Sequence, residues 1–184
     1  MTNMNEERIT VLDKKFRRYM SDSEIQACVK RVAEEMSRDL KGKDPILCPV
    51  LTGSYMFVAD LTRYLDFDPQ VSFVRYSSYA GTQSTGHVKA VLGFGEKCRG
   101  RDVVIVEDIV DSGISMEYML AELRKLEPAS IRICTFFFKP GNFQKDFKID
   151  YIGKSIPNDF ILGYGLDYDG MGRTYRDIYV LDEE

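Results

Sequence analysis

The fold of this chain is decided by residues 103–115, whose sequence is VVIVEDIVDSGIS. Its first four residues are all β-branched, which is typical of a strand buried on both faces of a sheet. Two adjacent carboxylates, Glu107 and Asp108, follow them. The polar turn 111–115 comes next, and from Met116 onward apolar residues recur at helical spacing. The stretch therefore predicts a strand, an acidic turn and a helix start in direct succession.

This acidic turn stands where α/β proteins bind ligands, beyond the carboxyl end of a strand. A helix start offers free backbone N–H groups and the positive end of the helix dipole, which suit a phosphate. Glu107 and Asp108 repel each other, so a cation is a natural third partner. The turn thus predicts magnesium beside a phosphorylated ligand, with a sugar phosphate favoured. One acidic turn alone leaves another explanation open, in which Asp111 and Ser112 only cap the helix.

Composition sets the class of protein. A chain of 184 residues suits a single domain, 1–184, with its own core. A net charge of −4 argues against non-specific binding to nucleic acid, because no strongly basic face is implied. Phosphate binding then has to rest on backbone groups, magnesium and a few well-placed cations.

Cysteine usage and hydropathy predict a cytoplasmic protein without a membrane partner. Cys28, Cys48, Cys98 and Cys134 are scattered with no CxxC pair, which is typical of reduced structural thiols. No apolar run is long enough to span a membrane. The polar residues 1–7 contain no secretory signal.

Helices and strands alternate along the rest of the chain. The capping-box pattern at 21–24 predicts a helix that runs to Leu40 and stops at Gly42. A further helix is predicted over 55–65. Strands are predicted at 46–51, 71–76, 87–92, 129–138, 150–154 and 178–181, with a short one near 9–12.

Three further segments are candidates for the same ligand site, each with a plainer alternative. Thr52-Gly53-Ser54 ends a strand before a helix; it is either an ordinary connection or a second turn that flanks the ligand. Residues 77–86 are small, polar and bounded by glycine, so they form either a long hairpin loop or a lid over the substrate. Lys139 is either a surface charge or a donor to a carbonyl or phosphate.

The run from Val106 to Gly113 resembles the ribose-phosphate-binding signature of the type I phosphoribosyltransferases, a specific motif. Four stretches match that family in order, from about residue 47 to 181. They are 51–54, Arg75 with 77–86, 107–115, and 139–173. Segments 150–153 and 160–168 are similar to those of the hypoxanthine-guanine branch of the family.

The resemblance implies a fold and a reaction. The expected fold is α/β, the type I phosphoribosyltransferase fold, with a mainly parallel twisted sheet flanked by helices. Its core spans roughly 21–140, and a small hood comes from the N-terminal residues and roughly 141–184. The implied reaction converts hypoxanthine or guanine and phosphoribosyl pyrophosphate to a purine nucleoside monophosphate and pyrophosphate, with Mg²⁺. A homodimer or homotetramer is expected.

The resemblance also implies roles for the phosphate and metal side. Glu107 and Asp108 hold the ribose hydroxyls and their magnesium, and Asp167 helps a second magnesium. The 5′-phosphate is wrapped by the loop that follows Asp111, namely Ser112, Gly113, Ile114 and Ser115. Thr52 and Gly53 bind pyrophosphate through an unusual cis peptide, and Arg173 also contacts pyrophosphate. The remaining substrate-binding residues are Arg75 and, in the lid, Ser78 and Tyr79.

On the base side, Asp111 is implied as the general base for the purine's imidazole nitrogen, help that is worth ~10²–10⁴-fold. Lys139 donates to the six-oxo group, so a six-amino base, which presents a donor to a donor, is disfavoured. Phe160 stacks on the base, and Ile161 meets the base edge through its backbone.

Three positions depart from the family pattern. Thr52 stands where a lysine is often found, Ser77 replaces a basic residue before the lid, and Ile114 replaces a polar or basic residue. Backbone N–H groups can bind phosphate without these side chains, so the departures bear on pyrophosphate affinity and subunit contacts.

Two other classes of protein were weighed against the enzyme. A non-catalytic regulator of the same fold that senses phosphoribosyl pyrophosphate can lose the base contacts, but Asp111, Lys139 and Phe160 are all present. A phospho-accepting receiver domain is expected to carry its acidic pair near the start of the chain and to lack the segment around Asp167. The enzyme is favoured over both.

Overall fold

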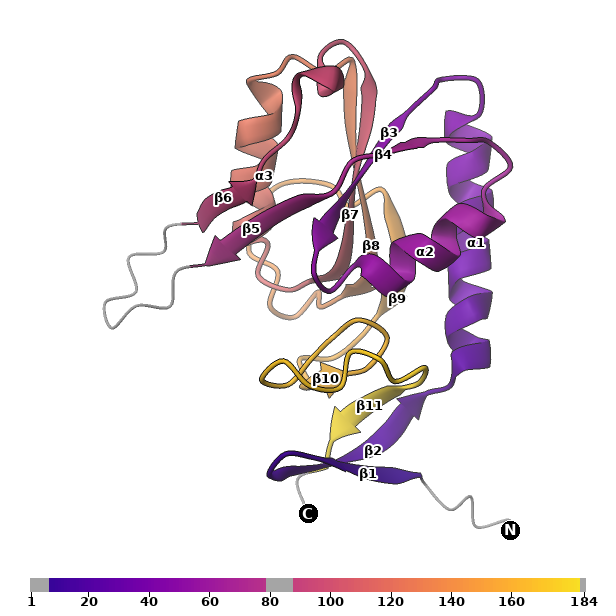
Figure 1. The fold of residues 1–184 in the computed structure, drawn as a ribbon, viewed down its shortest axis with the longest axis vertical. Helices are drawn as coiled ribbons and strands as arrows, with labels where there is room; N and C mark the ends of the chain where they lie inside the picture. The colour runs from indigo at the N-terminus through magenta and orange to yellow at the C-terminus, as the bar shows by residue number, and fades with distance from the viewer. Residues whose placement is uncertain (1–6, 79–87, 183–184) are drawn as a thin grey trace.

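The structure is a computed structural model that describes residues 7–78 and 88–182. A central sheet has the strand order β6-β5-β3-β7-β8-β9, with β4 paired to β3 (Figure 1). These strands are β3 (Ile46–Leu51), β4 (Gln70–Val71), β5 (Val74–Ser78), β6 (Val88–Leu92), β7 (Asp102–Val110), β8 (Ser130–Phe138) and β9 (Tyr151–Ser155). Among the described residues, the strand pairings of this sheet are all parallel except that of β5 with β6.

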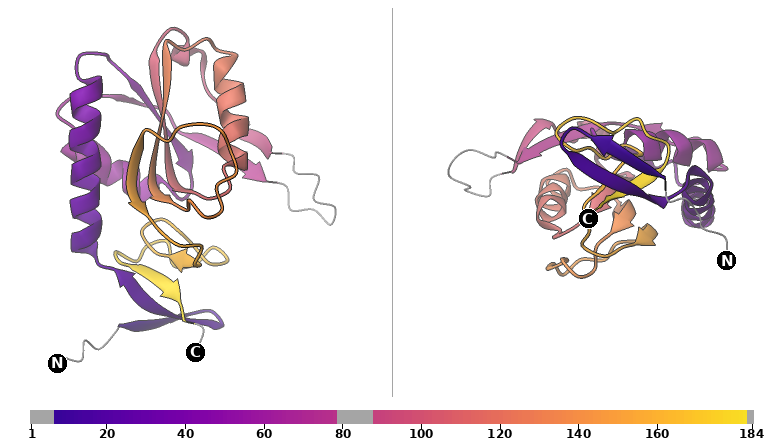
Figure 2. Two further views of the ribbon diagram at one scale, coloured as in Figure 1. Left: turned by 180° about the vertical axis from the view of Figure 1, so that it is seen from behind. Right: turned by 90° about the horizontal axis from the view of Figure 1, so that it is seen from below.

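The predicted central strand is confirmed as β7, and its residues 103–106 have no exposed surface. The strand continues to Val110, so Glu107 and Asp108, which were predicted to lie in a turn, belong to the strand itself. Both faces of the sheet are covered by helices, α1 (Asp22–Leu40) and α2 (Tyr55–Tyr64) on one side and α3 (Ile114–Arg124) on the other (Figure 2). Alternate residues of β7 enter the two layers: Val104 packs with α1 and α2, and Ile105 packs with α3. This is why the strand is apolar without alternation.

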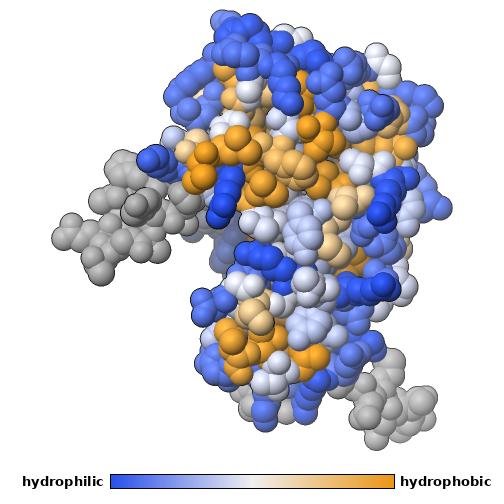
Figure 3. Space-filling model, viewed as in Figure 1, coloured by the Kyte–Doolittle hydropathy of each residue, from blue (hydrophilic) through white to orange (hydrophobic). Residues whose placement is uncertain are grey.

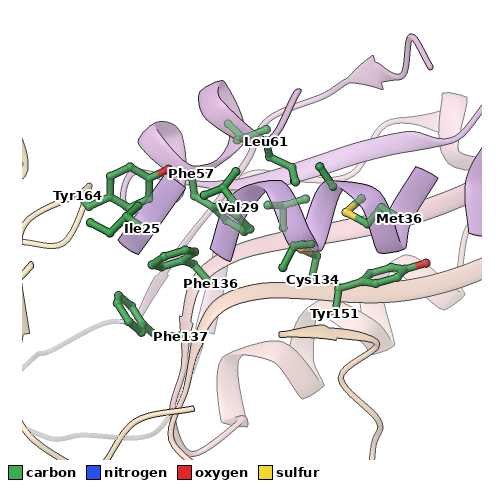
Figure 4. Packing of buried hydrophobic residues seen from close by; sticks show 14 of the residues in the cluster. Ile25, Val29, Met36, Phe57, Leu61, Cys134, Phe136, Phe137, Tyr151 and Tyr164 are labelled. Atoms are coloured by element: carbon green, nitrogen blue, oxygen red, sulfur yellow. The ribbon is translucent and has the colours of Figure 1, made fainter. Parts of the chain in front are cut away.

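Helix α1 begins where the capping box predicts. Ser21 accepts a hydrogen bond from the backbone N–H of Glu24, and the Glu24 carboxylate accepts one from the backbone N–H of Ser21. The stripe of Ile25, Val29 and Met36 is fully buried in the layer shown in Figure 4.

A second, terminal sheet is built from both ends of the chain, in the order β1-β2-β11-β10. Its strands are β1 (Arg8–Val11), β2 (Lys14–Met20), β10 (Ile161–Leu162) and β11 (Ile178–Leu181). Strand β2 was not predicted from the sequence, because only Phe16 and Met20 of its seven residues are buried and a spacing of four does not distinguish a strand from a helix.

The structure differs from the prediction at one boundary of the hood and within one predicted strand. Residues 151–155, which the sequence analysis placed with the hood, form β9 and pair with β8 in the central sheet. The strand predicted over 71–76 is divided, because β4 ends at Val71 and β5 starts at Val74. The other predicted helices and strands are confirmed within a few residues.

Gly153 provides a test of the packing between β9 and β8. A Cβ atom at this residue would lie 2.6 Å from the carbonyl oxygen of Phe136, a backbone atom that cannot rotate away. We expect Gly153→Ala to lower the free energy of unfolding by about 1–3 kcal/mol, the usual effect of overpacking.

The matched control is Gly93→Ala, because the nearest atom to a Cβ at Gly93 is 3.8 Å away. This variant should leave the free energy unchanged or raise it by about 0.4–1 kcal/mol. Urea unfolding of the parent and the two variants measures both changes in free energy. Equal effects of the two substitutions would contradict the close packing of β9 on β8.

Candidate functional site

Two of the predicted turns meet at one edge of the central sheet. Strands β3 and β7 are paired in parallel, with Pro49 opposite Val106, so the turns after them lie side by side. Gly53 is buried, and a Cβ atom on it would lie 1.6 Å from Oδ2 of Asp108. Only glycine allows this approach. The unusual cis peptide expected in the first turn joins Leu51 to Thr52.

The two carboxylates of β7 are half-buried. Burial, and then the neighbouring Asp108 carboxylate, raise the pKa of Glu107 well above its usual range. Burial also raises the pKa of Asp108, while hydrogen bonds and the charge of Arg173 oppose that rise. Desolvated, adjacent carboxylates of this kind fit a divalent cation, which would relieve their mutual repulsion.

The metal prediction is compatible with this donor set. Among the described residues, no three His, Cys, Asp or Glu side chains are grouped so that they hold a metal ion by themselves. Mg²⁺ commonly uses one or two carboxylates and completes its octahedron with water and substrate phosphate oxygens. Glu107 and Asp108 suffice for that mode of binding.

The segment after β7 forms a cradle at the start of α3. Gly113 precedes the helix with φ +82°, in the left-handed region that glycine adopts without strain. A cavity of about 150 Å³ is lined by Glu107 and by residues 109–116. Asp111 and Ser115 are exposed, and Ile114 is 51% exposed. The predicted phosphate-binding residues therefore share one cavity, which Ile109, missed in the sequence analysis, also lines.

A later loop supports this cradle from behind. A Cβ atom on Gly113 would lie 2.8 Å from the ring of Phe143 and 2.9 Å from Cγ of Lys145. Nζ of Lys145 forms an ion pair with Glu117 of α3 at 2.7 Å, and the backbone N–H of Gln144 donates to the carbonyl of Ser112. These residues were not predicted, because nothing in the sequence of 142–145 indicates a contact with α3.

The predicted base-binding residues come from β8 and the terminal sheet. Lys139 directly follows β8; its side chain is buried, and its backbone N–H donates to the carbonyl of Val110. The ring of Phe160 is 44% exposed and contacts Phe16 and Tyr168, with ring centroids 6.2 and 5.9 Å apart.

Phe160 lines a separate groove on the terminal sheet rather than the cavity of the phosphate cradle. Ile161 is buried in β10, opposite Val180 of β11. The backbone N–H of Leu181 donates to the carbonyl of Phe160, which fixes this segment to the sheet.

The remaining predicted residues lie around the turn at Gly53. Arg173 forms an ion pair with Asp167 at 2.6 Å and donates from Nη1 to the carbonyl of Gly165 at 2.7 Å. A Cβ atom on Gly165 would lie 2.0 Å from the carbonyl oxygen of Gly53. The pair formed by Arg173 and Asp167 is therefore linked, through Gly165, to the turn at Gly53 that was predicted to hold pyrophosphate.

The lid prediction is only partly covered by the described residues. Arg75 is exposed on β5 and pairs with Leu51 at the carboxyl end of β3. Ser77 and Ser78 are the last residues of β5. Tyr79 and the rest of the predicted lid, 79–86, lie outside the described residues.

Comparison with known proteins independently supports the resemblance to the phosphoribosyltransferases. A family model described as a phosphoribosyl transferase domain matches residues 21–169. The hypoxanthine-guanine phosphoribosyltransferase of Mycobacterium tuberculosis is 38% identical over 166 residues, covering 86% of this chain and 81% of that protein. The protein of that name from Lactococcus lactis is 37% identical over 175 residues, covering 94% of this chain and 95% of that one.

Solved structures agree. A crystal structure of hypoxanthine-guanine phosphoribosyltransferase from Bacillus anthracis matches with a TM-score of 0.84 at 32% identity, covering 90% of this chain and 98% of that chain. The hypoxanthine phosphoribosyl transferase of Trypanosoma cruzi matches with a TM-score of 0.85 at 34% identity, covering 95% of each chain. The predicted α/β fold class, with its mainly parallel sheet, is confirmed. The chain belongs to the hypoxanthine-guanine phosphoribosyltransferase family.

Proposed function

We propose that this protein transfers the phosphoribosyl group of phosphoribosyl pyrophosphate to hypoxanthine or guanine, releasing pyrophosphate and a purine nucleoside monophosphate for purine salvage. The observation that carries the proposal is the contact between Gly53 and Asp108 beside the cradle at the start of α3. This contact supports the proposal because it joins, at one sheet edge, the segments proposed to bind pyrophosphate, the ribose hydroxyls and the 5′-phosphate.

In the proposed reaction, an imidazole nitrogen of the base attacks C1′ of ribose while the bond from C1′ to the pyrophosphate oxygen breaks. The bonding electrons leave with pyrophosphate, so positive charge builds on the ribose, as in glycoside chemistry. The backbone N–H groups of 112–115 hold the 5′-phosphate. Asp111, which lines the same cavity, accepts the proton that the imidazole ring loses.

The cation and the pyrophosphate side complete the proposal. Glu107 and Asp108 hold the ribose hydroxyls and Mg²⁺, and Asp167 assists a second Mg²⁺. When bound, the metal neutralises and orients the leaving pyrophosphate. Arg173, Thr52 and Gly53 bind pyrophosphate. Arg75, with Ser78 and Tyr79 of the lid, is also proposed to contact the substrate.

The choice of base rests on two side chains. Lys139 is buried, so a donor contact to a six-oxo group is not weakened by water as it would be at the surface. Phe160 is held by Phe16 and Tyr168 and keeps enough exposed ring surface to stack on a purine. Ile161 presents its backbone at the base edge.

The alternative of a non-catalytic regulator is not supported, because the relatives described above are named as enzymes. We also propose a cytoplasmic location, which the four free cysteines favour. In the part of the chain that the structure covers, no helix has the length and apolar character needed to cross a membrane.

We further propose that the protein forms a homodimer or homotetramer through the exposed apolar face of β4 to β6. Val71, Phe73, Val91 and Leu92 are 39–61% exposed there, and Figure 3 shows apolar side chains gathered on this face. Contiguous apolar surface of this kind commonly marks an interface.

Replacing the proposed base tests the mechanism. We expect Asp111→Asn to lower kcat by roughly 10²–10⁴-fold, because the amide cannot accept the imidazole proton, while the affinity for nucleoside monophosphate stays close to that of the parent. Steady-state kinetics and calorimetry measure the two quantities. Asp68→Asn, a like change at an exposed residue after α2, is the control. Parent-like turnover in Asp111→Asn would remove Asp111 from this role.

Base selection tests Lys139. The parent protein should use adenine poorly beside hypoxanthine. Lys139→Met should lower kcat/KM for hypoxanthine by roughly tenfold to hundredfold, the effect expected for a lost charge-assisted hydrogen bond, whereas Lys30→Met on the exposed side of α1 should not. Rates with the two bases decide the matter; equal use of adenine and hypoxanthine by the parent would rule out the assignment.

The apolar face can be tested by charge. We expect the double substitution Val91→Lys and Leu92→Lys to shift the protein to a smaller species in sedimentation velocity, because buried lysines would repel across the interface. Leu12→Lys, at a residue that is 55% exposed outside this face, serves as control. An unchanged sedimentation coefficient in the double variant would place the interface elsewhere.

A further inference from the structure

Tyr164 holds an unusual position between the terminal sheet and the core. It has φ +47°, which is uncommon for a bulky residue, and it stands between Gly163 and Gly165. Its ring is buried and packs on Phe136, with centroids 5.3 Å apart. A backbone conformation of this kind persists only where the surroundings hold it, and such residues cluster at functional sites.

The hydroxyl of Tyr164 is anchored on helix α2. It donates to Oδ2 of Asp60 at 2.8 Å, and burial raises the pKa of this phenol, which therefore stays protonated. Asp60 also accepts a hydrogen bond from Nε2 of Gln26 at 2.7 Å, and Arg63 lies 3.8 Å away. Helix α2 starts at Tyr55, directly after the turn at Thr52 and Gly53, so the anchor and this turn belong to one rigid unit.

On its other side, Tyr164 places Gly165. The carbonyl of Gly53 lies so close to Gly165 that no side chain fits between them. The backbone N–H of Gly165 donates to the carbonyl of Arg173 at 2.9 Å, and its own carbonyl accepts from Nη1 of Arg173. Arg173 in turn holds Asp167. An unbroken series of contacts therefore runs from Asp60 to the residues proposed for pyrophosphate and the second metal.

We propose that Tyr164, held by Asp60, is a positioning residue that sets the pyrophosphate side of the site without touching the substrate. The inference rests on the proposed roles of Gly53, Asp167 and Arg173. Loss of the hydrogen bond lets the turn 163–167 shift relative to Gly53, so that Arg173 and Asp167 no longer meet pyrophosphate at the right distance. The phosphate cradle, on α3, and Phe160, held by Phe16, do not depend on this anchor.

The test compares two buried tyrosine–aspartate pairs in the same core. Tyr151 of β9 donates to Oδ2 of Asp39 at 2.9 Å, and Figure 4 shows Tyr151 and Tyr164 at opposite ends of the cluster. Tyr164→Phe and Tyr151→Phe each lose one such hydrogen bond. We expect Tyr164→Phe to raise KM for phosphoribosyl pyrophosphate roughly fivefold to tenfold, with KM for hypoxanthine changed less than about twofold. Tyr151→Phe should move neither constant.

Variants of Asp60 test the anchor from the helix side, where misfolding is a smaller concern because its side chain is 18% exposed. Asp60→Ala should reproduce the rise in KM for phosphoribosyl pyrophosphate. Asp60→Asn keeps a carbonyl acceptor for the Tyr164 hydroxyl and should stay within about twofold of the parent. The double variant Tyr164→Phe with Asp60→Ala should be no worse than either single variant, since both remove one interaction.

Two outcomes overturn the inference. One is a parent-like KM for phosphoribosyl pyrophosphate in both Tyr164→Phe and Asp60→Ala, or in Asp60→Ala alone if Tyr164→Phe does not fold. The other is an equal rise in KM for both substrates, or the same rise in Tyr151→Phe, because each indicates general loosening. A parent protein that forms no nucleotide from phosphoribosyl pyrophosphate and hypoxanthine contradicts the proposed function instead.

Discussion

The site depends on how closely the turn after β3 approaches the acidic end of β7. Parallel pairing of the two strands sets their ends side by side, and the missing side chain at Gly53 lets the backbone reach the carboxylate of Asp108. The same absence at Gly165 lets a turn from beside the terminal sheet rest on the carbonyl of Gly53. Two glycines thus let three chain segments meet at one edge of the sheet, where the charged substrate is proposed to bind.

In the described part of the chain, few unpaired positive charges lie near the proposed phosphate-binding residues. The chain is acidic overall, with a net charge of −4, and its proposed ligands are phosphates. Ile114 adds no charge to the cradle, and the nearby Lys145 is paired with Glu117. The proposed solution uses backbone N–H groups for one phosphate and metal ions with Arg173 for the other. Because Arg173 is already paired with Asp167, it is oriented before any substrate arrives.

The segments proposed to bind the base and pyrophosphate are held in place by different contacts. Phe160 is fixed by ring contacts with Phe16 and Tyr168 and by the pairing of β10 with β11. The turn at 163–167 is fixed instead by Tyr164, through Asp60 of the central layer. Independent supports allow the two halves of the site to be tuned separately, which suits an enzyme that binds two unlike substrates.

The sequence by itself determined most of the helices and strands, the acidic pair that follows the apolar run, and the family, because β-branched runs, the capping box and the 106–113 motif are local patterns. It also predicted that the turns after β3 and β7 flank one ligand, since parallel strands share an edge. Only the tertiary structure decided which side chains support that edge. Strand β2, the contact of Lys145 with α3 and the anchor from Tyr164 to Asp60 join residues far apart in the chain. Such contacts produce no periodic pattern in the sequence, because they depend on how the helices and sheets pack against one another.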